Sequence, residues 1–122
     1  MILVDTSVWI DHLRVGDAAL AALLNSSQVL MHPFILGELA CGNLRNRVEV
    51  LTLIKDLPRI AFATDAEVLF FIERHALMGR GIGYVDTHLL ASVTLVGVTQ
   101  LWTRDKRLRS VADSLVLAYG HV

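Results

Sequence analysis

Short apolar segments rich in β-branched residues alternate with segments of helical periodicity along the chain, and this alternation limits the folds that it can adopt. Segments typical of strands cover residues 2–4, 28–31, 98–102 and 115–118. Helices are expected over residues 6–13, 18–24, 34–41, 48–57, 65–76, 84–96 and 104–112. Alternating strands and helices favour a parallel sheet with right-handed crossovers and helices on both faces. We therefore predict an α/β fold that binds its ligand beyond the carboxyl ends of the strands.

Local signals mark the ends of several predicted helices. Asp17 and Thr64 stand where N-cap side chains are favoured, and Pro33 stands at a first helical position. Pro58 ends the helix that precedes it. These signals agree with the division into elements that the hydrophobic pattern gives.

The length of the chain predicts one domain over residues 1–122, without a linker or an internal repeat. Hydrophobic residues make up 54% of the sequence, and the mean hydropathy is +0.55. A domain of this size cannot bury so much apolar surface by itself. We therefore expect an apolar interface with a partner.

No segment of the sequence is typical of a membrane span or a signal peptide. The two longest uncharged stretches, 18–37 and 87–103, both contain several polar residues. The N-terminus reaches the carboxylate of Asp5 after a short apolar run. A cytoplasmic location without membrane contact is the resulting expectation.

Cysteine content and net charge exclude some classes of site. Cys41 is the single cysteine, so the sequence cannot form an internal disulfide or a site with several thiolate ligands. We expect it to be a small core residue. The formal net charge is -1, so nucleic-acid binding would depend on a local cluster of basic side chains.

Four of the twelve acidic residues stand where solvated helix faces do not explain them. Asp5 ends an apolar strand, and Asp105 follows another. Glu38 lies among apolar residues of a helix, and Asp86 lies in the first turn of an apolar helix. Taken singly, Asp5 and Asp86 could be helix caps, Glu38 could extend from a partly exposed helix, and Asp105 could be a turn residue. Their joint placement at the carboxyl edge of one sheet predicts a cluster.

Such a cluster needs a cation. Two carboxylates about 4 Å apart repel by roughly 4 kcal/mol at an effective dielectric constant near 20. Oxygen ligands alone suit Mg²⁺ or Mn²⁺ better than zinc, and such ions serve phosphodiester hydrolysis. The hydroxyls of Thr6, Ser7 and Thr103 could position a water molecule or the carboxylates, although Thr6 and Ser7 could equally be helix caps.

Other residues are candidates for nucleic-acid binding or catalysis. Basic residues that flank the acids and could contact RNA phosphates include Arg80, Arg104 and Lys106, each of which could equally belong to a solvated face. The glycine-rich segment 79–83 follows a predicted helix, unlike a dinucleotide-binding loop, and we interpret it as a flexible connection. The five histidines show no paired metal-ligand spacing. Two of them could form a metal-free acid-base pair, which we disfavour.

Four segments together resemble the acidic motifs of PIN-domain VapC toxins, in the order and spacing of that family. The segments are 2–10 (ILVDTSVWI), 37–39 (GEL), 86–91 (DTHLLA) and 103–108 (TRDKRL). The resemblance implies a Rossmann-like three-layer α/β/α sandwich and endonucleolytic cleavage of RNA with Mg²⁺ or Mn²⁺. It also implies a homodimer that is inhibited by a cognate VapB-type antitoxin. Its acidic cluster would consist of Asp5, Glu38, Asp86 and Asp105, with Thr103 as the hydroxyl of the last motif.

Three alternatives were considered. A phosphatase of the haloacid dehalogenase type would need an aspartate where Ser7 stands. A response-regulator receiver would need paired early acids and a late lysine at a strand end, which the sequence lacks. A catalytically silent module that uses the same fold to bind RNA or protein remains the main alternative, and the intact set of four acids argues against it.

Overall fold

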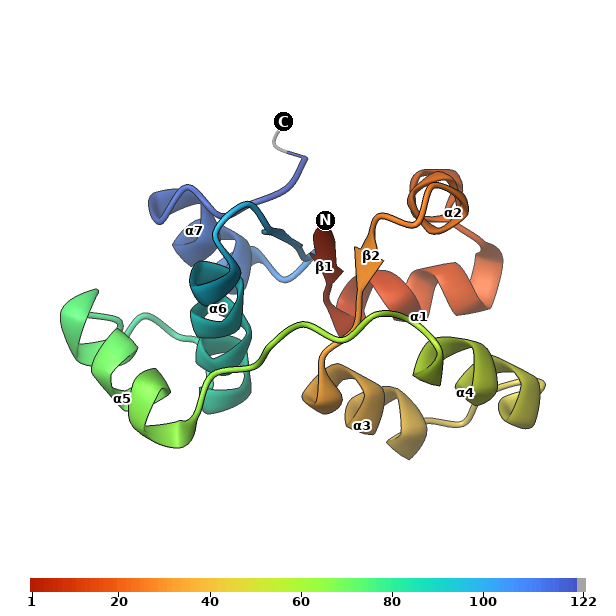
Figure 1. The fold of residues 1–122 in the computed structure, drawn as a ribbon, viewed down its shortest axis with the longest axis horizontal. Helices are drawn as coiled ribbons and strands as arrows, with labels where there is room; N and C mark the ends of the chain where they lie inside the picture. Colours follow the sequence, from red (N-terminus) through yellow and green to blue (C-terminus); the bar gives the residue numbers. More distant parts are fainter. Residues whose placement is uncertain (121–122) are drawn as a thin grey trace.

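The computed structural model describes residues 1–120, in which strands and helices alternate much as the sequence predicts. The strands are β1 (Ile2–Val4), β2 (Val29–Leu30) and β3 (Gln100–Trp102). The helices are α1 (Thr6–Val15), α2 (Ala18–Asn25), α3 (Pro33–Cys41), α4 (Arg47–Lys55), α5 (Asp65–Arg74), α6 (Tyr84–Val96) and α7 (Lys106–Ser114). In Figure 1, helices α1 to α4 lie on one side of the strands, and α5 to α7 lie on the other. The predicted three-layer α/β/α architecture is confirmed.

The sheet is parallel and has the strand order β2-β1-β3. Ile2 pairs with Val29 on one side and with Gln100 on the other, so β1 is the central strand. Single parallel bridges extend the sheet at both edges, from Met31 to Arg59 and from Leu101 to Ala118. The carboxyl ends of β1 and β3 are therefore adjacent, which brings the residues that follow them together.

The prediction of a last strand over residues 115–118 was wrong. Helix α7 runs to Ser114, and Leu115 forms its C-cap. The chain then turns through Val116, whose φ is 59°, a left-handed conformation that interrupts an extended segment. Only Ala118 reaches the sheet, where it pairs with Leu101.

The predicted caps form. Asp17 Oδ1 accepts a hydrogen bond from the Leu20 N–H at the start of α2, and Pro33 occupies the first turn of α3. Thr64 and Glu67 form a capping box at the start of α5. These local interactions fix the entry of three helices onto the sheet.

The core lies around β1 and α6. Leu3, Leu89 and Leu101 are completely buried, and every residue from 87 to 93 of α6 is buried. Among residues 1–120, no helix combines the length and apolar character that crossing a membrane requires. Helix α6 packs against β3, which pairs with β1, so the sheet and α6 together set the relative positions of Asp5 and Asp86.

Cys41 is exposed, so the prediction that it is a core residue was wrong. Helix α3 packs on the core through Ile35 and Leu39, which share a face at helical spacing. Cys41 lies in the last turn, away from that face. Glu38, expected on an apolar face, is also exposed and lies next to the buried Leu39 in the sequence.

Candidate active site

The fold brings Asp5, Glu38 and Asp105 close enough to Asp86 for their charges to act on its carboxyl group. Asp5 follows β1 and is the N-cap of α1, whereas Asp105 follows β3 and is the N-cap of α7. Burial is the main cause that raises the pKa of Asp86 above its ordinary value, and the charges of Asp5, Asp105 and Glu38 raise it further. A hydrogen bond from the Gly83 N–H opposes this shift. Like-charge coupling of this kind is typical of a functional site.

Hydrogen bonds engage one oxygen of each acid. Asp5 Oδ2 accepts from the Ser7 hydroxyl at 2.8 Å and from the Thr103 hydroxyl at 2.9 Å. Asp86 Oδ2 accepts from the Gly83 N–H at 3.3 Å, and Asp105 Oδ1 accepts from the Leu108 N–H at 2.9 Å. Within residues 1–120, the second oxygen of each of these carboxylates accepts no hydrogen bond from the protein. These second oxygens remain available to another ligand.

Glu38 follows the same pattern. Its Oε1 accepts a hydrogen bond of 2.6 Å from the hydroxyl of Thr6, which lies 32 positions away in the sequence. The hydroxyls of Thr6 and Thr103 thus each donate a hydrogen bond to one of the four acids. Ser7 contacts Asp5 through both its N–H and its hydroxyl, so it also belongs to this network.

In the part of the chain that the structure describes, no basic side chain forms an ion pair with the four acids. The ion pairs formed within residues 1–120 involve Asp11, Asp17, Asp65 and Asp113 but none of the four acids. In the same part of the chain, no three acidic, histidine or cysteine side chains converge closely enough to hold a metal ion as they stand. Four carboxylates that repel each other and lack a protein cation are nevertheless the oxygen donor set that Mg²⁺ and Mn²⁺ favour. The chemistry of the residues therefore suits such an ion, although their side chains would have to move closer together to hold it.

The three predicted RNA-contacting residues differ in their surroundings. Arg104 is held by two carboxylates, those of Asp11 and Asp17. Lys106 and Arg80 are exposed and form no ion pair within residues 1–120. Arg107 lies against the glycine-rich segment 79–83, so closely that a Cβ atom on Gly81 would stand 2.9 Å from its Cδ atom. This contact joins the segment before Asp86 to helix α7. Nothing in the sequence indicated it.

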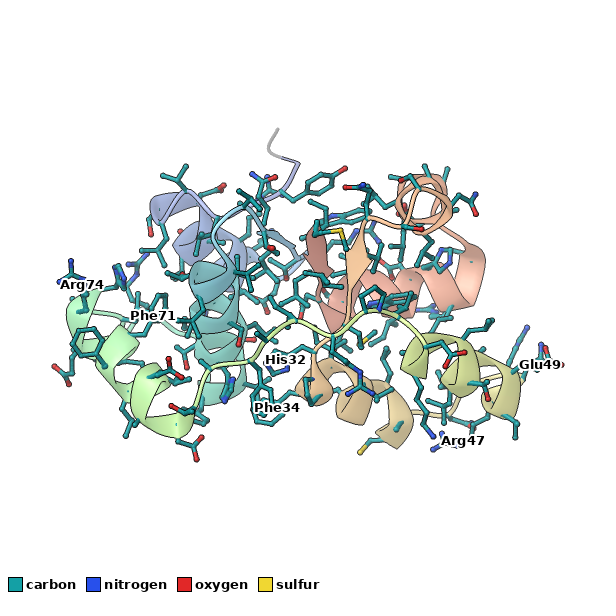
Figure 2. The ribbon with its side chains drawn as sticks, viewed as in Figure 1. His32, Phe34, Arg47, Glu49, Phe71 and Arg74 are labelled. Atoms are coloured by element: carbon teal, nitrogen blue, oxygen red, sulfur yellow. The ribbon has the colours of Figure 1, made fainter. Side chains whose placement is uncertain are left out.

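Two histidines form a buried aromatic cluster rather than a surface acid-base pair. His32 and His88 are 0% and 1% exposed, and their ring centroids lie 5.3 Å apart. The ring centroids of Phe34 and His88 lie 4.6 Å apart, a contact that joins α3 to α6. Figure 2 shows Phe34 beside His32 at the start of α3. Burial, with a smaller contribution from His88, lowers the pKa of His32 to about 4. A neutral His32 accepts a hydrogen bond from the Phe34 N–H and so caps α3, the helix that carries Glu38.

The fold defines a parallel α/β protein in which Asp5 and Asp105 follow adjacent strands at the carboxyl edge of the sheet. The family model of the PIN domain matches residues 2–114. The chain is 51% identical over 110 residues to "Ribonuclease VapC32" of Mycobacterium tuberculosis (strain CDC 1551 / Oshkosh), and to the protein of the same name from strain ATCC 25618 / H37Rv. Each alignment covers 90% of this chain and 89% of the relative. The chain belongs to the PIN-domain family, and the predicted resemblance to its VapC members is confirmed.

The Thr103 hydroxyl should contribute measurably to stability. Thr103→Val removes a donor to Asp5 and also the acceptor of the Asp105 N–H, at a residue that is 2% exposed. We expect the free energy of unfolding, measured in urea, to fall by about 1–3 kcal/mol. Thr99→Val is the matched control, because Thr99 is equally buried and its hydroxyl has no partner within residues 1–120. Equal effects of the two substitutions would contradict the assigned role of the Thr103 hydroxyl.

Neutralising Asp86 should stabilise the metal-free protein. Because its pKa is raised, Asp86 binds its proton more tightly in the folded chain than in the unfolded chain. The stability that this proton contributes is lost as pH rises from the ordinary carboxyl pKa through the raised value. In EDTA at neutral pH, Asp86→Asn should therefore raise the Tm, and the gain should vanish below about pH 3, where both states are protonated. A lower Tm for the variant at neutral pH would show that Asp86 is not repelled by its neighbours.

Proposed function

We propose that this chain is an endoribonuclease that hydrolyses RNA phosphodiester bonds with Mg²⁺ or Mn²⁺, and that it is the toxin of a type II toxin-antitoxin pair. Its membership of the PIN-domain family and its similarity to two proteins named "Ribonuclease VapC32" support the reaction. The observation that carries the metal dependence is the coupling of Asp86 to three other carboxylates without a protein cation among them.

The metal ligands would be Asp5, Glu38, Asp86 and Asp105. In each, hydrogen bonds within the described chain hold one carboxylate oxygen and leave the other available. A bound divalent ion would orient and deprotonate a water molecule, hold the scissile phosphate and stabilise the leaving oxygen. The exposed side chains of Glu38 and Asp105 have the rotamer freedom to adjust to an ion, whereas Asp5 is buried and fixed.

The hydroxyl groups orient this donor set. The Ser7 and Thr103 hydroxyls both donate to Asp5 Oδ2, which directs its remaining oxygen, Oδ1, to the ligand side. Thr6 restrains Glu38 in the same way. Groups that hold metal ligands commonly affect metal affinity or activity by about 10–100-fold. The network therefore supports Thr6 and Thr103 as positioning residues.

RNA phosphates would be contacted at the rim of the cluster. Arg80 and Lys106 flank Asp86 and Asp105 in the sequence and are exposed, so they can form sequence-independent contacts that weaken with salt. Arg104 is the weakest of the three candidates, because its charge is already offset by Asp11 and Asp17.

Two apolar surfaces support the proposed partners. A groove of about 420 Å³, lined by α1, α3, the segment 42–45 and α4, borders Glu38 and would hold a segment of the VapB-type antitoxin beside the active site. Exposed apolar residues of α5 and α6, which include Leu69, Phe70 and Leu95, would form a homodimer interface. Helices α4 and α5 lie at opposite ends of the molecule, so both partners can bind at once (Figure 1). Action on cellular RNA agrees with the predicted cytoplasmic location.

Replacing a single ligand should abolish cleavage without unfolding the chain. With a labelled structured RNA and Mn²⁺, the unmodified protein should cut, and EDTA should stop the reaction. Asp5→Asn should lose activity by at least about 100-fold, because it removes a metal ligand while its amide oxygen can still accept the hydrogen bonds of Ser7 and Thr103. Circular dichroism and antitoxin binding should be unchanged.

Three outcomes of that experiment would contradict the proposal. Undiminished cleavage by Asp5→Asn would exclude the acidic cluster as the active site. A folded protein that cuts RNA with no divalent metal present would favour the metal-free alternative. A folded protein that binds RNA but does not cut it with either metal added would favour the catalytically silent alternative.

A further inference from the structure

We propose that Arg104 is a positioning residue that fixes the Asp105 loop through Asp11 and Asp17, and not a residue that contacts RNA. This inference rests on the proposed function, because it takes Asp105 as a metal ligand. Arg104 stands between Thr103 and Asp105 in the segment that joins β3 to α7. Any contact that fixes Arg104 also restricts the residues on either side of it.

The side chain of Arg104 joins this loop to two other elements. Its Nη1 donates to Asp11 Oδ2 of α1 at 2.6 Å, and its Nη2 donates to Asp17 Oδ2 at the N-cap of α2. These partners are 93 and 87 positions away in the sequence. The planar guanidinium suits this geometry, because it presents separate N–H groups to two acceptors in fixed directions.

The backbone of Arg104 is held as well. Its N–H donates to the Ser7 hydroxyl at 3.0 Å, and that hydroxyl donates to Asp5 Oδ2. The next N–H, that of Asp105, donates to the Thr103 hydroxyl, which also donates to Asp5. The loop that carries Asp105 is thus tied to Asp5 by two hydroxyls and to α1 and α2 by one guanidinium.

The charge balance opposes a direct phosphate contact by Arg104. One guanidinium faces two carboxylates, so the group of Arg104, Asp11 and Asp17 carries a net charge of -1. An RNA phosphate would therefore have to approach a group whose net charge is also negative. Isolated surface ion pairs contribute little to stability, but one that restrains an active-site loop can affect activity through geometry.

The two roles predict opposite results when the carboxylates are removed. If Arg104 positions the loop, Asp11→Asn/Asp17→Asn should impair the site in the same way as Arg104→Gln. If Arg104 contacts RNA, freeing its guanidinium should strengthen RNA binding. Asparagine caps helices about as well as aspartate, so the double variant should preserve the start of α2.

The test measures kcat, KM and Mn²⁺ affinity for Arg104→Gln, Arg104→Lys and the double variant. We expect each to lower kcat or Mn²⁺ affinity about tenfold, with KM for RNA and the salt dependence of RNA binding unchanged. Arg104→Lys should not restore kcat or Mn²⁺ affinity, because one ammonium group cannot reproduce both guanidinium contacts. Arg109→Gln is the matched control, because Arg109 pairs with Asp113 on α7.

Two results would overturn the proposal. One is a higher KM for Arg104→Gln with unchanged kcat, together with rescue by lysine. In that case the slope of the logarithm of RNA affinity against the logarithm of salt concentration should also fall by about one, as expected of a phosphate contact. The other is tighter RNA binding by the double variant.

Amide hydrogen exchange of the metal-free protein separates this inference from the proposed function. The double variant should accelerate exchange at the Arg104 and Asp105 N–H groups, whether or not the protein cuts RNA. Unchanged exchange would exclude the positioning role even in an active ribonuclease. If the unmodified protein does not cut RNA but amide exchange is accelerated in the double variant, only the proposed function is contradicted.

Discussion

The partial burial of the Asp86 carboxylate near three other acids is the constraint on which the candidate site depends. Burial and the charges of Asp5, Asp105 and Glu38 all raise the pKa of Asp86, and no lysine or arginine within residues 1–120 pairs with any of the four. Packing alone does not favour such a group, since each close pair costs free energy in the absence of a cation. A divalent ion would convert this repulsion into binding affinity.

Helix caps and metal ligands are compatible roles in this molecule. Asp5 and Asp105 each cap a helix through one oxygen, and the other oxygen has no protein donor within the described chain. The helix N-terminus favours the charged carboxylate and fixes its direction. The sequence leaves helix cap and metal ligand as alternative roles for these acids. In the structure one oxygen of each side chain can cap the helix while the other is available to a ligand.

The positions of the acids were predictable because they follow from chain topology. Asp5 and Asp105 end adjacent parallel strands, and strand ends can be recognised from short apolar runs. The partners of Arg104 were not predictable, since Asp11 and Asp17 approach it only through the tertiary arrangement of α1 and α2. The exposure of Glu38 and Cys41 was missed for a related reason, because α3 is apolar on more than the face that it buries.

Residues 115–118 show that strand propensity alone does not decide the local structure. Residues 115–118 have the composition of a strand, but the C-cap of α7 at Leu115 and the left-handed Val116 leave only Ala118 to pair. Local strand preference is overridden there by the end of the preceding helix, which lies two residues beyond the end that the sequence predicts.

The most direct test of the account is an NMR titration of the carboxyl carbons of Asp5, Glu38, Asp86 and Asp105, with and without Mg²⁺. The account predicts a raised pKa for Asp86 in the metal-free protein, a fall in that pKa when Mg²⁺ is added, and a common binding curve for all four signals. An Asp86 that titrates in the ordinary carboxyl range and does not respond to Mg²⁺ would contradict it.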